Sequence, residues 1–252
     1  MSPIRIRSAI AALALAVIAG CASVAPDYAR EKRLADEVVP SIVVGDAAML
    51  ETGTGRKFLG LLTPAAKPRA ALILVHGAGV HPDFGLVGAL RAGLADRGYT
   101  TLSIQMPVLA ADANTAGYPA LFPEAGERIA AAIDYLRRKG AARVAIVSHS
   151  MGARMVNDFI AHRPDVPLVA WVPVAISNGQ FDSLSGVRFP ILDIYAEKDF
   201  DVVLQGAAAR AKVLRGLKGS RQAMVYGADH HFARKSKEVA ALIDQLLKPL
   251  AR

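Results

Sequence analysis

Short apolar runs separated by helix-length segments restrict this chain more than any other feature of its sequence. The runs span residues 70–75 (AALILV), 100–105, 142–147, 168–175, 189–196 and 221–226. A run without polar alternation is typical of a strand that is buried on both faces of a sheet. The segments 83–97, 124–139, 152–161, 204–217 and 239–250 between and after them are predicted to be helices. This alternation predicts parallel βαβ units, and therefore an α/β fold with a mostly parallel central sheet and helices on both faces.

The segment before these units has a different pattern. Residues 38–62 hold short alternating runs, bounded by Gly-Thr-Gly and then by Pro64, which favours an antiparallel entry to the sheet. No insertion is long enough for a large cap domain, so we expect an open site at the carboxyl ends of the strands. The loops 79–84, 107–122 and 177–187 are the candidates for lining it.

The first residues have the pattern of an export signal. Arg5 and Arg7 precede a short apolar stretch, which is too short for a membrane-spanning helix, and small residues follow. Ile-Ala-Gly-Cys, ending at Cys21, resembles the lipobox of bacterial lipoproteins, with ordinary secretory cleavage near Ala22 as the alternative. We therefore expect a signal peptide over residues 1–20, lipidation of Cys21, a tether over 21–36 and one domain over 37–252. Alanine after the cysteine is typical of lipoproteins sent to the periplasmic side of the outer membrane.

Charge and cysteine usage restrict the partners. The net charge is +8, but the basic residues fall at helix-like positions without interleaved aromatic residues, which indicates a solvated face. They include Arg137, Arg138, Lys139, Arg210, Lys212, Arg215 and Lys218. We therefore expect no nucleic-acid partner and a membrane contact through the lipid anchor, with attraction to a membrane surface left open as a role for the basic charge. Cys21 is the only cysteine, so no disulfide can form within the chain.

Three side chains of complementary chemistry each follow a predicted strand. Ser150 follows the run 142–147, Asp199 follows 189–196, and His230 follows 221–226. A serine hydroxyl becomes a good nucleophile when an imidazole can take its proton, and a carboxylate orients that imidazole. The order Ser, Asp, His therefore predicts a catalytic triad. Asp201 and Asp182 are alternatives for the acid, and His231 is an alternative for the base.

The serine lies in Ser-His-Ser-Met-Gly, between a strand and a helix. In the nucleophile elbow G-x-S-x-G, the glycines allow strand and helix to pack closely around the serine. Here Ser148 replaces the first glycine and Gly152 retains the second. An oxyanion hole would use the backbone N–H groups of Met151 and Ala78, the latter in the loop that follows His76-Gly77. His76 is expected to brace that loop, and His149 to pack beneath the elbow.

These motifs, HGAG, SHSMGA, YAEKD and GADHHF in that order, resemble the α/β-hydrolases from about Leu59 to the end of the chain. "LRAGLADRGYTTLSIQMP" and "GADHHF" are similar to a family of uncharacterised bacterial α/β-hydrolase-like proteins. The resemblance implies a serine hydrolase, with carboxylic ester hydrolysis as the expected reaction. It also favours His230 over His231, because related sequences end in the form G-A-x-H-x-F. No cofactor and no metal are implied, since no ligand spacing accompanies Asp229, His230 and His231.

Alternative functions stay open. The same triad serves thioesterases, amidases, peptidases and acyltransferases. Ser148 also leaves open a catalytically silent scaffold that acts as an envelope binding protein. The expected partner of an active enzyme is a small ester-type molecule.

Overall fold

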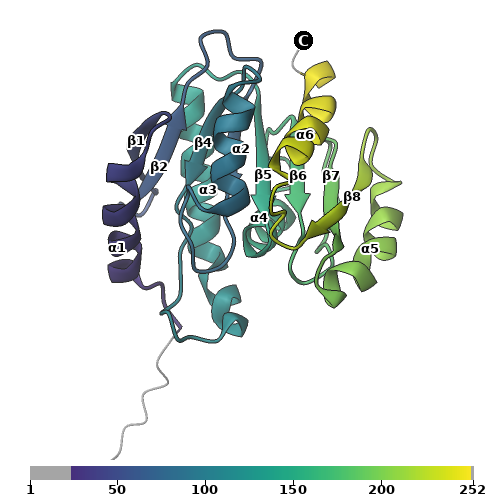
Figure 1. Ribbon diagram of the computed structural model, residues 1–252, viewed down its shortest axis with the longest axis horizontal. Helices are drawn as coiled ribbons and strands as arrows, with labels where there is room; N and C mark the ends of the chain where they lie inside the picture. Colours follow the sequence, from purple (N-terminus) through teal and green to yellow (C-terminus); the bar gives the residue numbers. More distant parts are fainter. Residues whose placement is uncertain (1–23, 251–252) are drawn as a thin grey trace, which may run out of the picture.

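The computed structural model describes residues 24–250 as an eight-stranded sheet with helices on both faces (Figure 1). The signal peptide over 1–20 and Cys21 lie outside the described residues. The first half contains α1 (Tyr28–Val38), η1 (Val39–Ser41), β1 (Asp46–Glu51), β2 (Lys57–Thr63), β3 (Ala71–Val75), α2 (Gly85–Ala95), β4 (Thr100–Ile104), η2 (Thr115–Leu121) and α3 (Phe122–Arg138). The second half contains β5 (Val144–His149), α4 (Met151–His162), β6 (Ala170–Val174), β7 (Leu192–Lys198), α5 (Asp201–Leu214), β8 (Arg221–Asp229) and α6 (Ser236–Leu250).

The strand order is β1-β2-β4-β3-β5-β6-β7-β8, with β1 and β2 antiparallel to their neighbours and the other six strands parallel. The chain leaves β3 in one direction to reach β4 and later returns on the other side to β5. Val75 of β3 pairs with Ser148 of β5, so the loops that follow these two strands lie side by side. Ligands of open α/β sheets bind at such a switch point.

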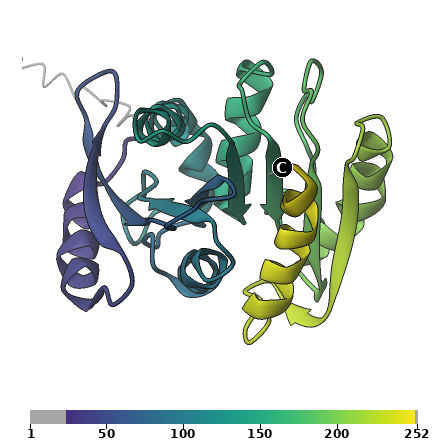
Figure 2. The ribbon, with the colours of Figure 1, turned by 90° about the horizontal axis from the view of Figure 1, so that it is seen from above.

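Two hydrophobic layers hold the sheet. Helices α2 and α6 cover one face, while α3, α4 and α5 cover the other (Figure 2). Strands β3 and β6 are buried along their whole length, as their unbroken apolar sequences predict. Every connection in the described part of the chain is a loop, one α-helix or a short 3₁₀ turn, so no lid domain covers the strand ends. The predicted fold class is confirmed.

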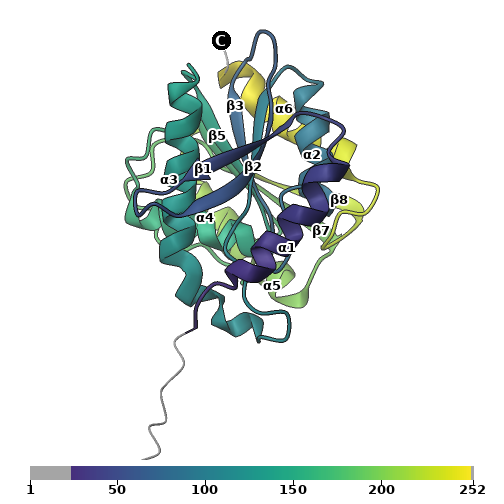
Figure 3. The same ribbon diagram turned by 90° about the vertical axis from the view of Figure 1, so that its left-hand side faces the viewer.

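The amino-terminal segment differs from the expected tether. Residues 28–38 form α1, capped by the side chain of Asp27, which accepts a hydrogen bond from the N–H of Arg30 (2.8 Å). Glu31 pairs with Arg128 of α3 (2.9 Å), and Val38 packs on β2. Figure 3 shows α1 beside β1 and β2. Polar composition is misleading here because one of the two buried residues of α1 is the charged Glu31, the other being Val38. Among the described helices, none is long and apolar enough to span a membrane.

One residue expected on the solvated basic face is buried. The side chain of Arg210 is 1% exposed and donates to Asp193 of β7 through Nε (2.8 Å). Gln222 donates to the same carboxylate oxygen (2.7 Å). Asp193 therefore has two polar partners, from α5 and β8. They favour its charged form, but burial has the larger effect and raises its pKa above the ordinary value of an aspartate.

Candidate active site

A strained residue connects β5 to α4. Ser150 has φ of 56° and ψ of −118°, a conformation that side-chain-bearing residues adopt rarely and mainly at functional sites. The helix begins at the next residue and passes directly beneath β3. A Cβ atom added at Gly152 would overlap the carbonyl oxygen of His76 and lie 2.8 Å from that of Val75. The turn therefore requires glycine on its helix side.

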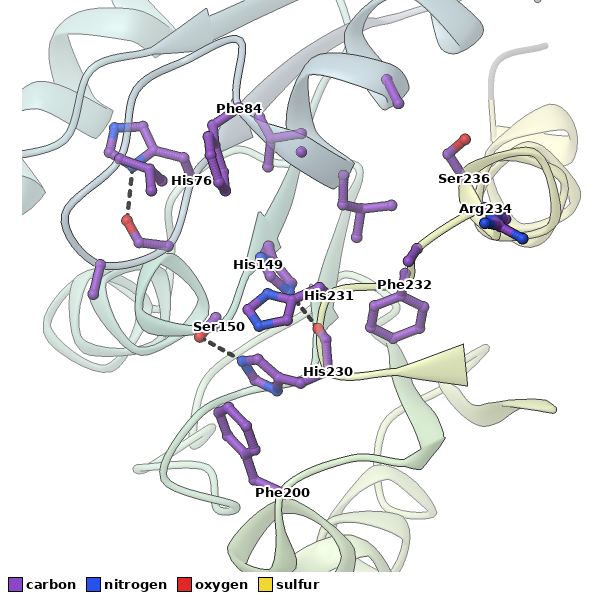
Figure 4. A pocket seen from close by; sticks show the side chains of 18 residues that line it. His76, Phe84, His149, Ser150, Phe200, His230, His231, Phe232, Arg234 and Ser236 are labelled. Carbon is purple, nitrogen blue, oxygen red and sulfur yellow. Dashed lines mark hydrogen bonds between the residues drawn. The ribbon is translucent and has the colours of Figure 1, made fainter. Parts of the chain in front are cut away.

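The three side chains predicted at separate strand ends are brought together. Ser150 Oγ lies 2.9 Å from His230 Nε2, and His230 Nδ1 lies 2.6 Å from Asp199 Oδ1. Figure 4 shows Ser150 and His230 pointing toward each other across the floor of the pocket. An ionised carboxylate only accepts hydrogen bonds, so Nδ1 carries the proton and Nε2 is free to accept one from the serine. This is the protonation state that a general base needs.

The carboxylate of Asp199 is held charged although it is buried. Burial raises its pKa, but hydrogen bonds from His230, the N–H of Ala196 (3.0 Å) and the N–H of Phe200 (2.9 Å) lower it further than burial raises it. The net result is a pKa below the ordinary value of an aspartate. Neither Asp201 nor Asp182 contacts the imidazole among the described hydrogen bonds.

Two further rings fix the imidazole of His230. Phe200 stacks on it, with ring centroids 3.8 Å apart and an angle of 17° between the planes. His149 lies on another side and donates through Nε2 to the backbone oxygen of His230 (2.9 Å). Burial lowers the pKa of His149 to about 4, so this histidine is neutral at physiological pH. By contrast, His231 is exposed, and its ring meets that of His230 only edge-on.

The loop after β3 is fixed by His76. Its Nε2 accepts the N–H of Met106 (2.9 Å), which places the proton on Nδ1, and Nδ1 donates to the carbonyl oxygen of Gly77 (2.8 Å). Burial lowers the pKa of His76 to about 3 and keeps this arrangement neutral. In a trans peptide the C=O and N–H point in opposite directions, so the N–H of Ala78 points away from the His76 ring. Within residues 24–250 that N–H donates to no other group.

The second predicted donor is the N–H of Met151, at the start of α4. The first N–H groups of a helix have no partner within the helix, and their positive end favours a developing anion. A Cβ placed on Gly77 would lie 3.4 Å from Ser150 Cβ, so the loop passes directly against the serine. The two predicted donors therefore flank Ser150. Their role as an oxyanion hole stays a prediction.

Ser148, the departure from the elbow pattern, has a specific partner. Its Oγ accepts a hydrogen bond from Trp171 Nε1 on the neighbouring strand β6 (2.9 Å), and both side chains are fully buried. The hydroxymethyl group thus takes part in the packing of β5 on β6 instead of projecting into the turn. This pair could not be predicted from the sequence, since the two residues are 23 positions apart.

Substituting Ser148 by alanine is expected to lower the free energy of unfolding by about 1–3 kcal/mol, because the indole N–H of Trp171 is left buried without an acceptor. Urea unfolding of Ser148→Ala, Trp171→Phe and the double variant would measure the coupling between the two positions. A coupling energy of zero would contradict a structural role for this hydrogen bond.

A pocket of about 630 Å³ opens above the serine. Its walls come from the loop after β3, the start of α2 and the segment after β8, and the side chains are mostly apolar. They include Val80, Phe84, Leu86, Val87, Phe200 and Phe232. Arg234 and Ser236 lie toward one end, while His231 lies beside His149 and His230 (Figure 4). No cluster of potential metal ligands occurs within residues 24–250.

Only one of the three loops expected to line the site does so. Val80 and Phe84 of the loop 79–84 contribute to the pocket, but the loops 107–122 and 177–187 do not. Tyr118 and Leu121 are buried in the core beneath α3, and Phe181 packs on the ring of Trp171 (5.6 Å between centroids). In both loops, these side chains pack in the core instead of lining the pocket.

Among the comparisons with known proteins, only the solved structures indicate the fold. A family described as "protein of unknown function (DUF3530)" matches residues 26–127, a region that contains the loop after β3 and ends before Ser150. The search of curated proteins gave no match.

Solved structures resemble the chain over most of its length. Est1E from Butyrivibrio proteoclasticus is 16% identical, with a TM-score of 0.61 and coverage of 82% of this chain and 99% of its own. It has also been solved with ferulic acid bound. A serine hydrolase without a lid from Xanthomonas campestris is 16% identical (TM-score 0.63, coverage 83% and 96%). A dienelactone hydrolase from Anabaena variabilis is 19% identical (TM-score 0.64, coverage 80% and 95%). The chain therefore has the α/β-hydrolase fold.

Proposed function

We propose that this protein is a serine hydrolase that cleaves carboxylic esters through an acyl-enzyme intermediate. The observation that carries the proposal is the hydrogen-bonded series Ser150, His230, Asp199 at a strained elbow beneath an open apolar pocket. The resemblance of the fold to solved hydrolases supports it, although similarity of fold alone does not define a reaction.

The proposed reaction follows from the protonation states. Ser150 Oγ attacks the ester carbonyl carbon while His230 Nε2 takes the hydroxyl proton, and the N–H groups of Ala78 and Met151 stabilise the oxyanion. The C–O bond then breaks, and the imidazolium returns the proton to the leaving alcohol. Water, deprotonated by His230, then attacks the acyl carbon. The bond from that carbon to Ser150 Oγ breaks, the imidazolium returns the proton to Ser150 Oγ, and the acid leaves. Asp199 stabilises the imidazolium in both halves.

The pocket suggests the kind of ester. Its walls are mostly apolar, so an apolar acyl or alcohol group would bury surface there, at about 25 cal/mol per Å². The volume suits a medium-sized group, and no lid formed by residues 24–250 has to move for the substrate to enter. Ferulic acid in Est1E is an example of a small acid bound to this fold.

The cellular location is proposed from the sequence alone. Export through residues 1–20 and lipidation of Cys21 would hold the enzyme at the periplasmic side of the outer membrane. Attachment there would bring the pocket to esters in the envelope.

A fluorophosphonate probe, which reacts only with an activated serine, tests the proposal. We expect wild-type protein starting at Ala22 to be labelled and to hydrolyse p-nitrophenyl esters, and Ser150→Ala to do neither. Wild type and Ser150→Ala should unfold at the same temperature, since Ser150 Oγ is at the pocket surface. Absence of labelling in folded wild type would contradict the proposal and favour a silent binding protein. Labelling without ester hydrolysis would favour a thioesterase, amidase, peptidase or acyltransferase instead.

A further inference from the structure

The helix α1 contacts the same loop that carries the predicted oxyanion donor. Arg30 Nη2 donates to the carbonyl oxygen of Gly79 (2.8 Å), and Arg30 Nη1 donates to that of Leu109 (2.7 Å). One guanidinium therefore joins the loop after β3 to the loop after β4. Gly79 has a φ of 71°, and a Cβ added to it would lie 3.2 Å from Arg30 Nη2, so the side chain lies directly against this backbone.

The position of Arg30 is itself fixed on two sides. Asp27 caps the helix and donates its own N–H to the carbonyl oxygen of Val108 (2.7 Å). Glu31 forms hydrogen bonds of 2.9 and 3.1 Å with the guanidinium of Arg128, whose side chain is fully buried. Arg128 in turn donates to the carbonyl oxygen of Gln105 (3.0 Å). The helix is thus docked by directional contacts, which specify a position more sharply than apolar packing does.

These contacts lead to the peptide unit between Gly77 and Ala78. The carbonyl oxygen of Gly77 is held by His76, whose other nitrogen is held by Met106, next to Gln105. The next carbonyl oxygen but one, that of Gly79, is held by Arg30. The peptide unit whose N–H would bind the oxyanion is therefore restrained at two carbonyl oxygens. His76 holds that of Gly77, and Arg30 of α1 holds that of Gly79.

We propose that Arg30 is a positioning residue for the oxyanion loop. The inference rests on the proposed function. In the reaction, Arg30 touches no substrate atom and fixes the direction of the Ala78 N–H by holding the carbonyl oxygen of Gly79. An oxyanion donor is effective only when it is preorganised, and a displacement of about 1 Å can cost about 10²-fold in rate.

The test compares Arg30→Ala and Arg30→Lys with Arg33→Ala, a charge removal on the exposed face of the same helix. For each protein, the active sites are titrated with the fluorophosphonate, and kcat and KM per active site are measured with p-nitrophenyl butyrate. We expect Arg30→Ala to lower kcat by about 10- to 100-fold and to leave KM within about twofold. Arg30→Lys should recover only part of kcat, because a single ammonium does not reproduce the fork that holds two carbonyl oxygens. Arg33→Ala should match wild type.

Titration separates positioning from stability. A purely structural role would reduce the number of active sites and the melting temperature, with kcat per site unchanged, and that result would overturn the inference. If wild type is active and Arg30→Ala has the same kcat per active site, this inference is overturned and the proposed function is not. Wild type without labelling or hydrolysis overturns the proposed function and this inference together.

Discussion

Replacing His230 by alanine is expected to lower kcat for ester hydrolysis by about 10⁴- to 10⁶-fold, because the hydroxyl of Ser150 then has no acceptor for its proton. The imidazole is 2.9 Å from the serine and 2.6 Å from Asp199, so it is the only group in the described site that contacts both. The measurement is steady-state hydrolysis of a p-nitrophenyl ester at equal concentrations of folded wild type and variant, with folding checked by circular dichroism.

The adjacent histidine provides the matched control. His231→Ala removes an exposed ring that makes no hydrogen bond to Ser150, and kcat is expected to stay within about threefold of wild type. The fold of His230→Ala should persist, since the hydrogen bond from His149 goes to the backbone oxygen of residue 230, which the substitution retains. Loss of activity in His231→Ala with retention in His230→Ala would assign the base to His231.

The sheet could be predicted because its signals are local. Unbroken apolar runs define β3, β5 and β6, and a complete start and stop pattern defines α3, which ends before Gly140 with a φ of 88°. The predicted strand boundaries were less accurate where residues are buried in the core without being paired in the regular ladder of the sheet. The predicted strand over 189–196 begins at residue 192, because Phe189 and Ile191 are buried in the core before the regular ladder starts.

The helix α1 shows why other parts could not be predicted. Its segment is charged, and its buried partners lie far along the chain: Gly79 is 49 positions from Arg30, and Arg128 is 97 positions from Glu31. Nothing in the sequence of this segment distinguishes Arg30 and Glu31, which have partners in the domain, from charged residues that face water. The same limit applies at Ser148. The elbow pattern G-x-S-x-G predicts glycine at this position, whereas the serine is accounted for by its hydrogen bond from Trp171, which is distant in the sequence.

For the candidate site, the sequence predicts which residues meet but not what supports them. Ser150, Asp199 and His230 follow strand ends that parallel topology brings to one edge. Phe200 was missed although it directly follows Asp199, since stacking on the imidazole depends on the turn that carries both residues. Apolar residues next to a catalytic candidate are therefore a signal worth considering.

The second large effect is expected at Gly152. Gly152→Ala should lower the free energy of unfolding by about 3 kcal/mol or more, because the added methyl group meets two backbone oxygens, those of His76 and Val75, which cannot rotate away. Relief of the overlap requires α4 to move from β3, and that movement displaces Ser150. We therefore expect the fluorophosphonate reaction to slow as well, even in the fraction that folds.

Gly126 on α3 is the matched control, because a Cβ added there meets only the ring of Phe159 at 3.5 Å, an ordinary contact. Alanine is the better helix former, so Gly126→Ala should raise the free energy of unfolding by about 0.5–1 kcal/mol. Urea unfolding of the two variants measures both effects, and soluble yield replaces it if Gly152→Ala does not fold. Both substitutions add one methyl group to a glycine within a helix, so opposite signs isolate the backbone overlap from helix propensity. Equal gains in stability would mean that the elbow has room for a side chain, and that glycine at position 152 is not what shapes the turn.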